Sequence, residues 1–239
     1  MLINNQGFFI VTPPRSGTHF LVDSISFLLK KHNKTFTKYD NDFWNHPTVK
    51  RNDSVIGTHC LIKDKKILEF AKERKVITTT RHPLGQALSI LAMYRRGFDP
   101  DWEIKDQPLM ENLSNCQPNS SEFLNFIKSN EFKNMRKITD DWKGLGIVVD
   151  FDKILNMDKE EYKKISKYIG IDFVPKNIEK SRKKYKDGMV FLGDPDLWRG
   201  VICQDIANEA LKIFPEYDMT TYGNSSLDGN WIFDNALKI

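Results

Sequence analysis

The sequence predicts an α/β protein with three layers, in which a mainly parallel central sheet is flanked by helices. Residues 8–12 form a short run with four apolar residues followed by Thr12, and it ends at two prolines, as is typical of a strand buried on both faces. From Gly17 onward, Phe20 and Ile25 begin a pattern of helical spacing. Strand, tight turn and helix therefore follow one another directly, and this alternation recurs along the chain.

Three further strands are predicted at residues 55–59, 76–80 and 147–149, because these short runs are rich in β-branched side chains. Periodicity, capping residues and breakers predict helices over residues 67–74, from Pro83, over 121–141 with an interruption or bend near Ser129, and over 159–168 and 206–214. Residues 95–120 contain three prolines and no clear period, and we expect them to cross the sheet edge as a long irregular excursion.

Length and composition indicate one domain that spans residues 1–239. Hydrophobic residues make up 40% of the chain, which is enough for a packed core. The three cysteines are far apart and lack histidines at metal-ligand spacing, so neither a disulfide framework nor a zinc site is expected. The sequence contains neither a signal-peptide core nor a membrane-spanning run. We expect a cytoplasmic protein without membrane insertion.

The net charge of +4 favours anionic partners only weakly, because 36 basic residues are spread among 32 acidic ones. Basic residues are concentrated within residues 180–186. This cluster is interpreted as the solvated face of a helix, and no nucleic-acid partner is expected, because no nucleic-acid motif lies nearby.

Residues 14–20, with the sequence PRSGTHF, occupy the first strand-to-helix turn. Open α/β sheets bind ligands at such turns, where the N–H groups of a helix N-terminus can face a phosphate. Gly17 allows close backbone approach, Ser16 and Thr18 add hydroxyl groups, and Arg15 adds a permanent charge. A simple helix cap and turn would also explain this composition. The GxxxxGK[ST] spacing is absent, which disfavours an NTPase that uses the usual lysine and magnesium.

A second strand-to-helix junction places Arg81 at the end of a strand and Ser89 two helical turns later. Because the carboxyl ends of parallel strands share one edge of a sheet, the two loops are expected to lie at the same edge. Two anion sites on one edge would suit a ligand with two separated phosphates.

These motifs resemble those of the sulfotransferases that use 3'-phosphoadenosine-5'-phosphosulfate (PAPS), and the resemblance covers most of the chain. It implies a P-loop-NTPase-like sulfotransferase fold and a first loop that binds the 5'-phosphosulfate. It also implies that Phe20 stacks near the adenine, and that Arg81 and Ser89 hold the 3'-phosphate. The residues assigned to nucleotide binding are Arg15, Ser16, Gly17, Thr18, His19, Phe20, Arg81, Ser89, Gly193 and Arg199.

The same resemblance assigns the general base to His59, in the segment Gly57-Thr58-His59. Gly57 stands where many members of the family carry a lysine, so that charge is absent or comes from elsewhere. Phe151 takes the place of a family tyrosine. Near the C-terminus, Phe191 and Leu192 replace the basic pair that closes on the 3'-phosphate, and Arg199 is one candidate substitute.

The resemblance therefore implies transfer of a sulfuryl group from PAPS to a hydroxyl or an amine of a small-molecule or glycan acceptor. His59 would accept the proton, Arg15 would stabilise charge on the leaving phosphate, and no metal would be required. Two alternatives remain: a kinase or NTPase with an atypical phosphate loop, and a non-catalytic nucleotide-binding protein of the same fold. Candidate walls of the acceptor pocket are Phe43, Trp44, Phe98, Trp102 and Met110, although core packing explains such aromatics equally well.

Overall fold

The computed structural model describes residues 6–97, 112–174, 194–222 and 226–237. They form two compact units that the chain enters twice. The sheet unit comprises the described residues of 1–80 and 136–185, and the helical unit those of 81–135 and 186–239. The chain passes from the first unit to the second directly after Thr80. The expectation of a single domain stays a prediction.

The sheet unit is built on five parallel strands in the order β2-β3-β1-β4-β5. They are β1 (Phe8–Val11), β2 (Lys34–Phe36), β3 (Val55–Thr58), β4 (Lys75–Thr80) and β5 (Gly146–Asp150). The central strand β1 pairs with β3 on one side and with β4 on the other, so that Phe8 lies beside both Val55 and Lys75.

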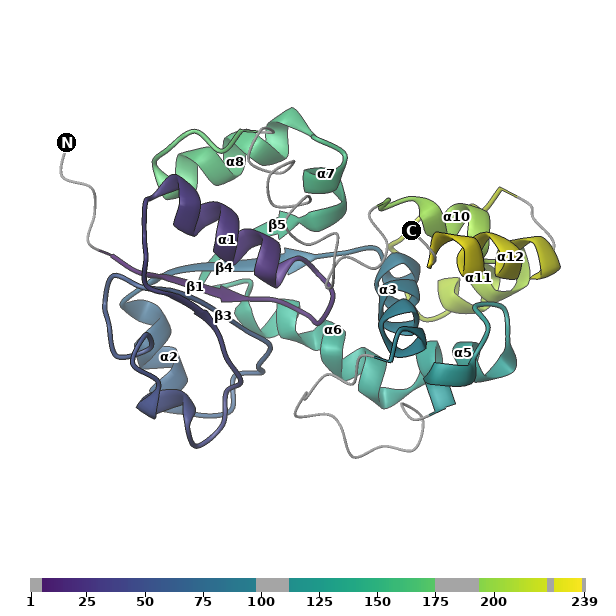
Figure 1. The fold of residues 1–239 in the computed structure, drawn as a ribbon, viewed down its shortest axis with the longest axis horizontal. Coiled ribbons are helices and arrows are strands. Elements are labelled where there is room, and N and C mark those ends of the chain that lie inside the picture. The colour runs from purple at the N-terminus through teal and green to yellow at the C-terminus, as the bar shows by residue number, and fades with distance from the viewer. Residues whose placement is uncertain (1–5, 98–111, 175–193, 223–225, 238–239) are drawn as a thin grey trace. The chain divides into compact units, whose positions relative to one another are not determined.

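Alternate residues of the strands point to opposite faces of the sheet, and helices cover both faces (Figure 1). Phe8 and Ile10 pack with α1 (Thr18–Leu28), α7 (Phe151–Leu155) and α8 (Lys159–Ile169). Phe9 and Val11 pack on the other face, against α2 (Lys65–Lys72) and the second half of α6 (Asn130–Trp142). The predicted class, a three-layer α/β fold with a parallel sheet, is confirmed.

Side chains and glycines set the helix ends in the sheet unit. The Asp64 carboxylate accepts from the backbone N–H of Ile67 and starts α2. Asp158 caps α8 in the same way, and Gly170 ends it in the left-handed conformation, with a φ of 83°. The 3-10 turn η1 (Phe43–Asn45) lies between β2 and β3.

The helical unit surrounds an apolar core to which Leu91, Phe126 and Trp198 belong. Its helices are α3 (Pro83–Arg95), α5 (Ser121–Lys128), the first half of α6, α10 (Leu197–Val201), α11 (Gln204–Leu211) and α12 (Ser226–Ala236), with the 3-10 turn η2 (Asn112–Asn115). The interruption or bend predicted near Ser129 is present as a break between α5 and α6, where the Ser129 hydroxyl accepts from the N–H of Phe132. Residues 98–111 of the predicted irregular excursion lie outside the described residues.

No helix within the described ranges is long and apolar enough to cross a membrane.

Candidate functional site

The loop after β1 lies at the point where the chain's path over the sheet reverses. From β1 the chain runs to β2 and β3 on one side, and it later adds β4 and β5 on the other. Ligands of open α/β sheets bind at the carboxyl ends of the strands at such a switch point. The Thr79 hydroxyl of β4 donates to the backbone carbonyl of Ser16 at 2.9 Å and ties the loop to the neighbouring strand.

Two residues of the loop that leads into α1 have left-handed backbones. The φ angle is 61° at Arg15 and 92° at Gly17. Gly17 is the N-cap residue of α1, and no side chain caps this helix end. The Ser16 hydroxyl is fully buried and has no hydrogen-bond partner among the described residues. An uncapped helix N-terminus beside an unpartnered buried hydroxyl can accommodate an anion, because both supply donors.

Gly17 also lies in close contact with Phe151. A Cβ atom at Gly17 would lie 2.2 Å from Phe151 Cε2, and the positive φ of this residue disfavours any L side chain. We therefore expect Gly17→Ala to lower the free energy of unfolding by about 2 to 4 kcal/mol, the sum of backbone strain and overpacking.

Urea denaturation of Gly17→Ala would measure this loss. Gly144→Ala is the matched control, because a Cβ there meets nothing within 4 Å. Equal stability of the two variants would contradict the tight contact between Gly17 and Phe151.

His59 follows β3 and is partly exposed. Its Nδ1 lies 2.7 Å from the backbone carbonyl oxygen of Thr12, the residue that follows β1. A carbonyl only accepts hydrogen bonds, so Nδ1 carries the proton and the neutral ring keeps its lone pair on Nε2. A histidine in this tautomer can accept a proton from a bound hydroxyl.

Electrostatics keep this histidine neutral. Burial is the main reason that the pKa of His59 is lowered to about 4; the nearby His19 and Arg15 act in the same direction, and the hydrogen bond to Thr12 opposes them. Burial and Arg15 also lower the pKa of His19, while Asp23 raises it. Arg15, His19 and His59 thus form a basic group around the loop, and a bound anion would raise the pKa of both imidazoles.

Phe36, the last residue of β2, contacts both histidines. Its ring centroid is 4.2 Å from that of His19 and 5.1 Å from that of His59. Gly57 lies opposite Phe36 in the neighbouring strand. A Cβ at Gly57 would come within 2.7 Å of Val22 on α1, which explains why no lysine stands at this position.

The second half of α6 fixes the segment that carries His59. The Trp142 indole donates to the Cys60 carbonyl at 2.8 Å, and the Asp141 carboxylate accepts from the N–H of Ile62. Thr139 donates to the Thr79 carbonyl at the end of β4. Cys60 and Trp142 are buried, so the backbone next to His59 is held rigidly.

Arg81 and Ser89, the pair assigned to the 3'-phosphate, belong to the helical unit. Both are buried, with exposed fractions of 5% and 2%. Arg81 precedes His82, the N-cap residue of α3, and its Nε lies 3.9 Å from the position that a Cβ at Gly85 would occupy. Their joint role at a phosphate stays a prediction.

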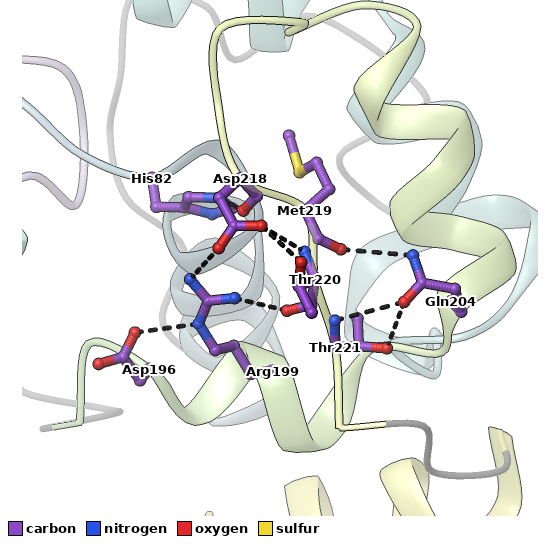
Figure 2. A network of polar contacts seen from close by, with 8 residues as sticks. All are labelled: His82, Asp196, Arg199, Gln204, Asp218, Met219, Thr220 and Thr221. Atoms are coloured by element: carbon purple, nitrogen blue, oxygen red, sulfur yellow. Dashed lines mark hydrogen bonds and ion pairs between the residues drawn. The ribbon is translucent and has the colours of Figure 1, made fainter.

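Arg199 lies at the centre of a polar network in the helical unit (Figure 2). Its guanidinium donates to the carboxylates of Asp196 and Asp218 and to the carbonyl of Thr220. Hydrogen bonds from Thr220 and Arg199 lower the pKa of Asp218 to about 2, so this partner is ionised at neutral pH. A phosphate at Arg199 would have to compete with two carboxylates, and the assignment of Arg199 to nucleotide binding stays a prediction.

Trp198 lies between His82 and Arg199. The His82 ring stacks on the indole at 4.0 Å, the guanidinium lies 4.5 Å from the same ring, and His82 Nε2 donates to the Asp218 carbonyl. Trp198 is 1% exposed. It therefore packs against His82 at the start of α3 rather than offering a ligand surface.

The aromatic residues proposed to contact the adenine or the acceptor differ in burial. Phe20 is buried and packs edge-on against Phe151, so its stacking on an adenine stays a prediction. Phe43 is fully buried and belongs to the core, whereas Trp44 is partly exposed.

Several residues singled out in the sequence lie outside the described ranges. They are the candidates Gly193, Phe98, Trp102 and Met110, the pair Phe191 and Leu192, and the basic cluster 180–186.

Sequence reasoning missed two residues of this site. Phe36 lies in a three-residue edge strand that lacks an apolar pattern, and nothing in the sequence singles it out. Thr12 acts through its backbone carbonyl, and its hydroxyl pairs with that of Thr18 inside the loop. A hydroxyl at the end of a strand that precedes a phosphate loop is the only signal for Thr12.

Comparison with known proteins leaves the family of this chain open. No protein-family model matches the chain, and no curated protein sequence matches it. Among solved structures, it is similar to the crystal structure of mouse sulfotransferase SULT7A1 complexed with PAP, with a TM-score of 0.48 and 19% sequence identity. The match covers 79% of this chain and 67% of that one.

The described part of the chain contains no cluster of three or more His, Cys, Asp or Glu side chains that could hold a metal ion. The expectation that no metal is required stays a prediction.

Proposed function

We propose that this protein is a sulfotransferase that transfers a sulfuryl group from PAPS to a hydroxyl or an amine of a small-molecule or glycan acceptor. The observation that carries the proposal is the bond between His59 Nδ1 and the Thr12 carbonyl. It joins a neutral base to the same loop whose helix N-terminus can hold the phosphosulfate. Donor and base would then lie side by side, as in-line transfer requires.

In the proposed reaction, His59 Nε2 takes the proton of the acceptor hydroxyl as its oxygen forms a bond to sulfur. The bond between sulfur and the bridging phosphate oxygen breaks, and adenosine 3',5'-bisphosphate leaves. Arg15 and the N–H groups at the start of α1 stabilise the negative charge that develops on this leaving group. The buried hydroxyl of Ser16 supplies one more donor.

Selection of PAPS over a donor without the 3'-phosphate is assigned to Arg81 and Ser89. An arginine and a hydroxyl are suitable donors for a dianionic phosphate. The proposed enzyme works in the reducing cytoplasm, in keeping with the buried thiols of Cys60 and Cys116.

The direct test is conversion of PAPS to adenosine 3',5'-bisphosphate with a panel of phenols, alcohols, amines and oligosaccharides, followed by nucleotide chromatography. The proposal predicts product formation that depends on an acceptor and persists in EDTA. Magnesium-dependent hydrolysis of ATP under the same conditions would instead support a kinase-like enzyme. Nucleotide binding without turnover of any donor would support a non-catalytic protein.

Arg15→Ala should lower the maximal rate by about 10-fold to 100-fold, because the lost charge acts on the leaving phosphate in the transition state. The measurement is kcat at saturating PAPS, with Arg51→Ala as a control that removes an exposed arginine of the same unit. If excess PAPS restores the full rate, Arg15 contributes only to ground-state binding.

A further inference from the structure

A second histidine, His19, is held beside the base by contacts between α1 and β2. Its ring lies on Phe36 at 4.2 Å. One helical turn later, Asp23 forms an ion pair with Lys34, two residues before Phe36 in β2. These two contacts share one face of α1 and fix the position of His19 as the second residue of the helix.

The surroundings of His19 are mixed in charge. Arg15 in the loop disfavours a positive charge on His19 and Asp23 of the same helix favours one, while Lys34 of β2 pairs with Asp23. Phe36 of β2 contacts the rings of both His19 and His59. Gly57 of β3 adds no side chain here, since α1 packs where its Cβ would project. His19 therefore has a carboxylate nearby, which helps it to hold a positive charge.

His59 is less able than His19 to hold a positive charge. Burial opposes its charged form most strongly, and both His19 and Arg15 repel a proton on it. Its Nδ1 is already committed to the Thr12 carbonyl. When an anion binds at the loop, it offsets the charge of Arg15 for both rings, and the ring with the carboxylate neighbour protonates first.

We propose that His19 takes up a proton from solvent when an anion binds at the loop, and that the imidazolium compensates the anion's charge while His59 stays neutral as the base. The identity of the natural anion rests on the proposed function, whereas the uptake of a proton by His19 does not. The two histidines therefore have different roles: His19 is the cation and His59 is the proton acceptor.

Imidazole ¹⁵N NMR at pH 7 tests this division in the unmodified protein, with inorganic sulfate as a probe that does not itself titrate near this pH. Addition of sulfate should shift both nitrogens of His19 to imidazolium values, while His59 keeps a protonated Nδ1 and an unprotonated Nε2. His19→Gln should weaken sulfate binding by about 10-fold, as expected for loss of a charge-assisted hydrogen bond. His32→Gln, at an exposed position, is the matched control.

Protonation of His59 instead of His19, or of neither ring, would overturn the inference. The same spectra recorded with adenosine 3',5'-bisphosphate separate it from the proposed function. A His19 response to sulfate without binding of the bisphosphate would refute the donor assignment and leave the role of His19 standing. Absence of binding by both anions would refute both.

Discussion

Replacement of His59 by Ala should slow sulfuryl transfer by about 100-fold or more at saturating PAPS, while adenosine 3',5'-bisphosphate still binds. The hydrogen bond from Nδ1 to the Thr12 carbonyl places the lone pair of the neutral ring on Nε2, and the substitution removes this proton acceptor. This substitution removes the proposed proton acceptor and changes no residue of the loop after β1.

The measurement is kcat from single-turnover experiments, together with the bisphosphate dissociation constant of the same variant. His32→Ala serves as the control, because it removes an exposed histidine outside the site. A near-normal rate in His59→Ala would exclude this residue as the base. Parallel losses of turnover and of nucleotide binding would indicate a positioning role instead.

The role of His59 as the base also predicts the pH dependence of kcat and kcat/KM in the wild-type enzyme. His59 has a lowered pKa of about 4, so it is available as a base above this pH in the free protein and is lost below it. The profile of kcat/KM reports the free enzyme, whereas that of kcat reports the complex. A bound anion raises the pKa of His59, and the acidic limb of kcat should therefore lie at higher pH than that of kcat/KM.

Arg81→Ala should erase the preference for a 3'-phosphate. A charge-assisted hydrogen bond contributes about 1.5 to 3 kcal/mol, or roughly one to two powers of ten in affinity. We expect the wild-type protein to bind adenosine 3',5'-bisphosphate more tightly than ADP by this factor, and the variant to bind the two alike.

Isothermal titration with both nucleotides measures this ratio, and Arg51→Ala is the control for loss of one positive charge. Since Arg81 is 5% exposed, circular dichroism should confirm that the variant is folded. If the preference survives in folded Arg81→Ala, another group holds the 3'-phosphate, and Arg199 would then have to leave Asp196 and Asp218 to do so.

Much of the sheet unit could be predicted from sequence, because its central strands are short apolar runs next to clear turn signals. The strand at residues 8–12 and the helix after Gly17 are present as β1 and α1. The edge strand β2 was missed, because Lys34, Thr35 and Phe36 carry no alternating pattern and are held mainly by pairing with β3. Its contribution to the site depends on tertiary packing.

The helical unit was harder to predict. The short helix α10 contains Gly200 and spans a single turn or so, and α12 contains Gly229, so neither has a strong helical signal. The hydrogen bond from His59 to Thr12 could not be predicted from sequence either, because its acceptor is a backbone carbonyl 47 residues away in the chain. Sequence motifs name reactive side chains, but tautomers and partners depend on the folded backbone.

The most direct test of the central claim is a thermal-shift comparison of adenosine 3',5'-bisphosphate, ADP and ATP, each with magnesium and with EDTA. A ligand that binds only the folded state raises the melting temperature, and the shift grows with the logarithm of the ratio of ligand concentration to dissociation constant. The PAPS-dependent account predicts the largest shift with the bisphosphate, unchanged by EDTA. A larger shift with ATP that requires magnesium, or no shift with any of the three, would contradict it.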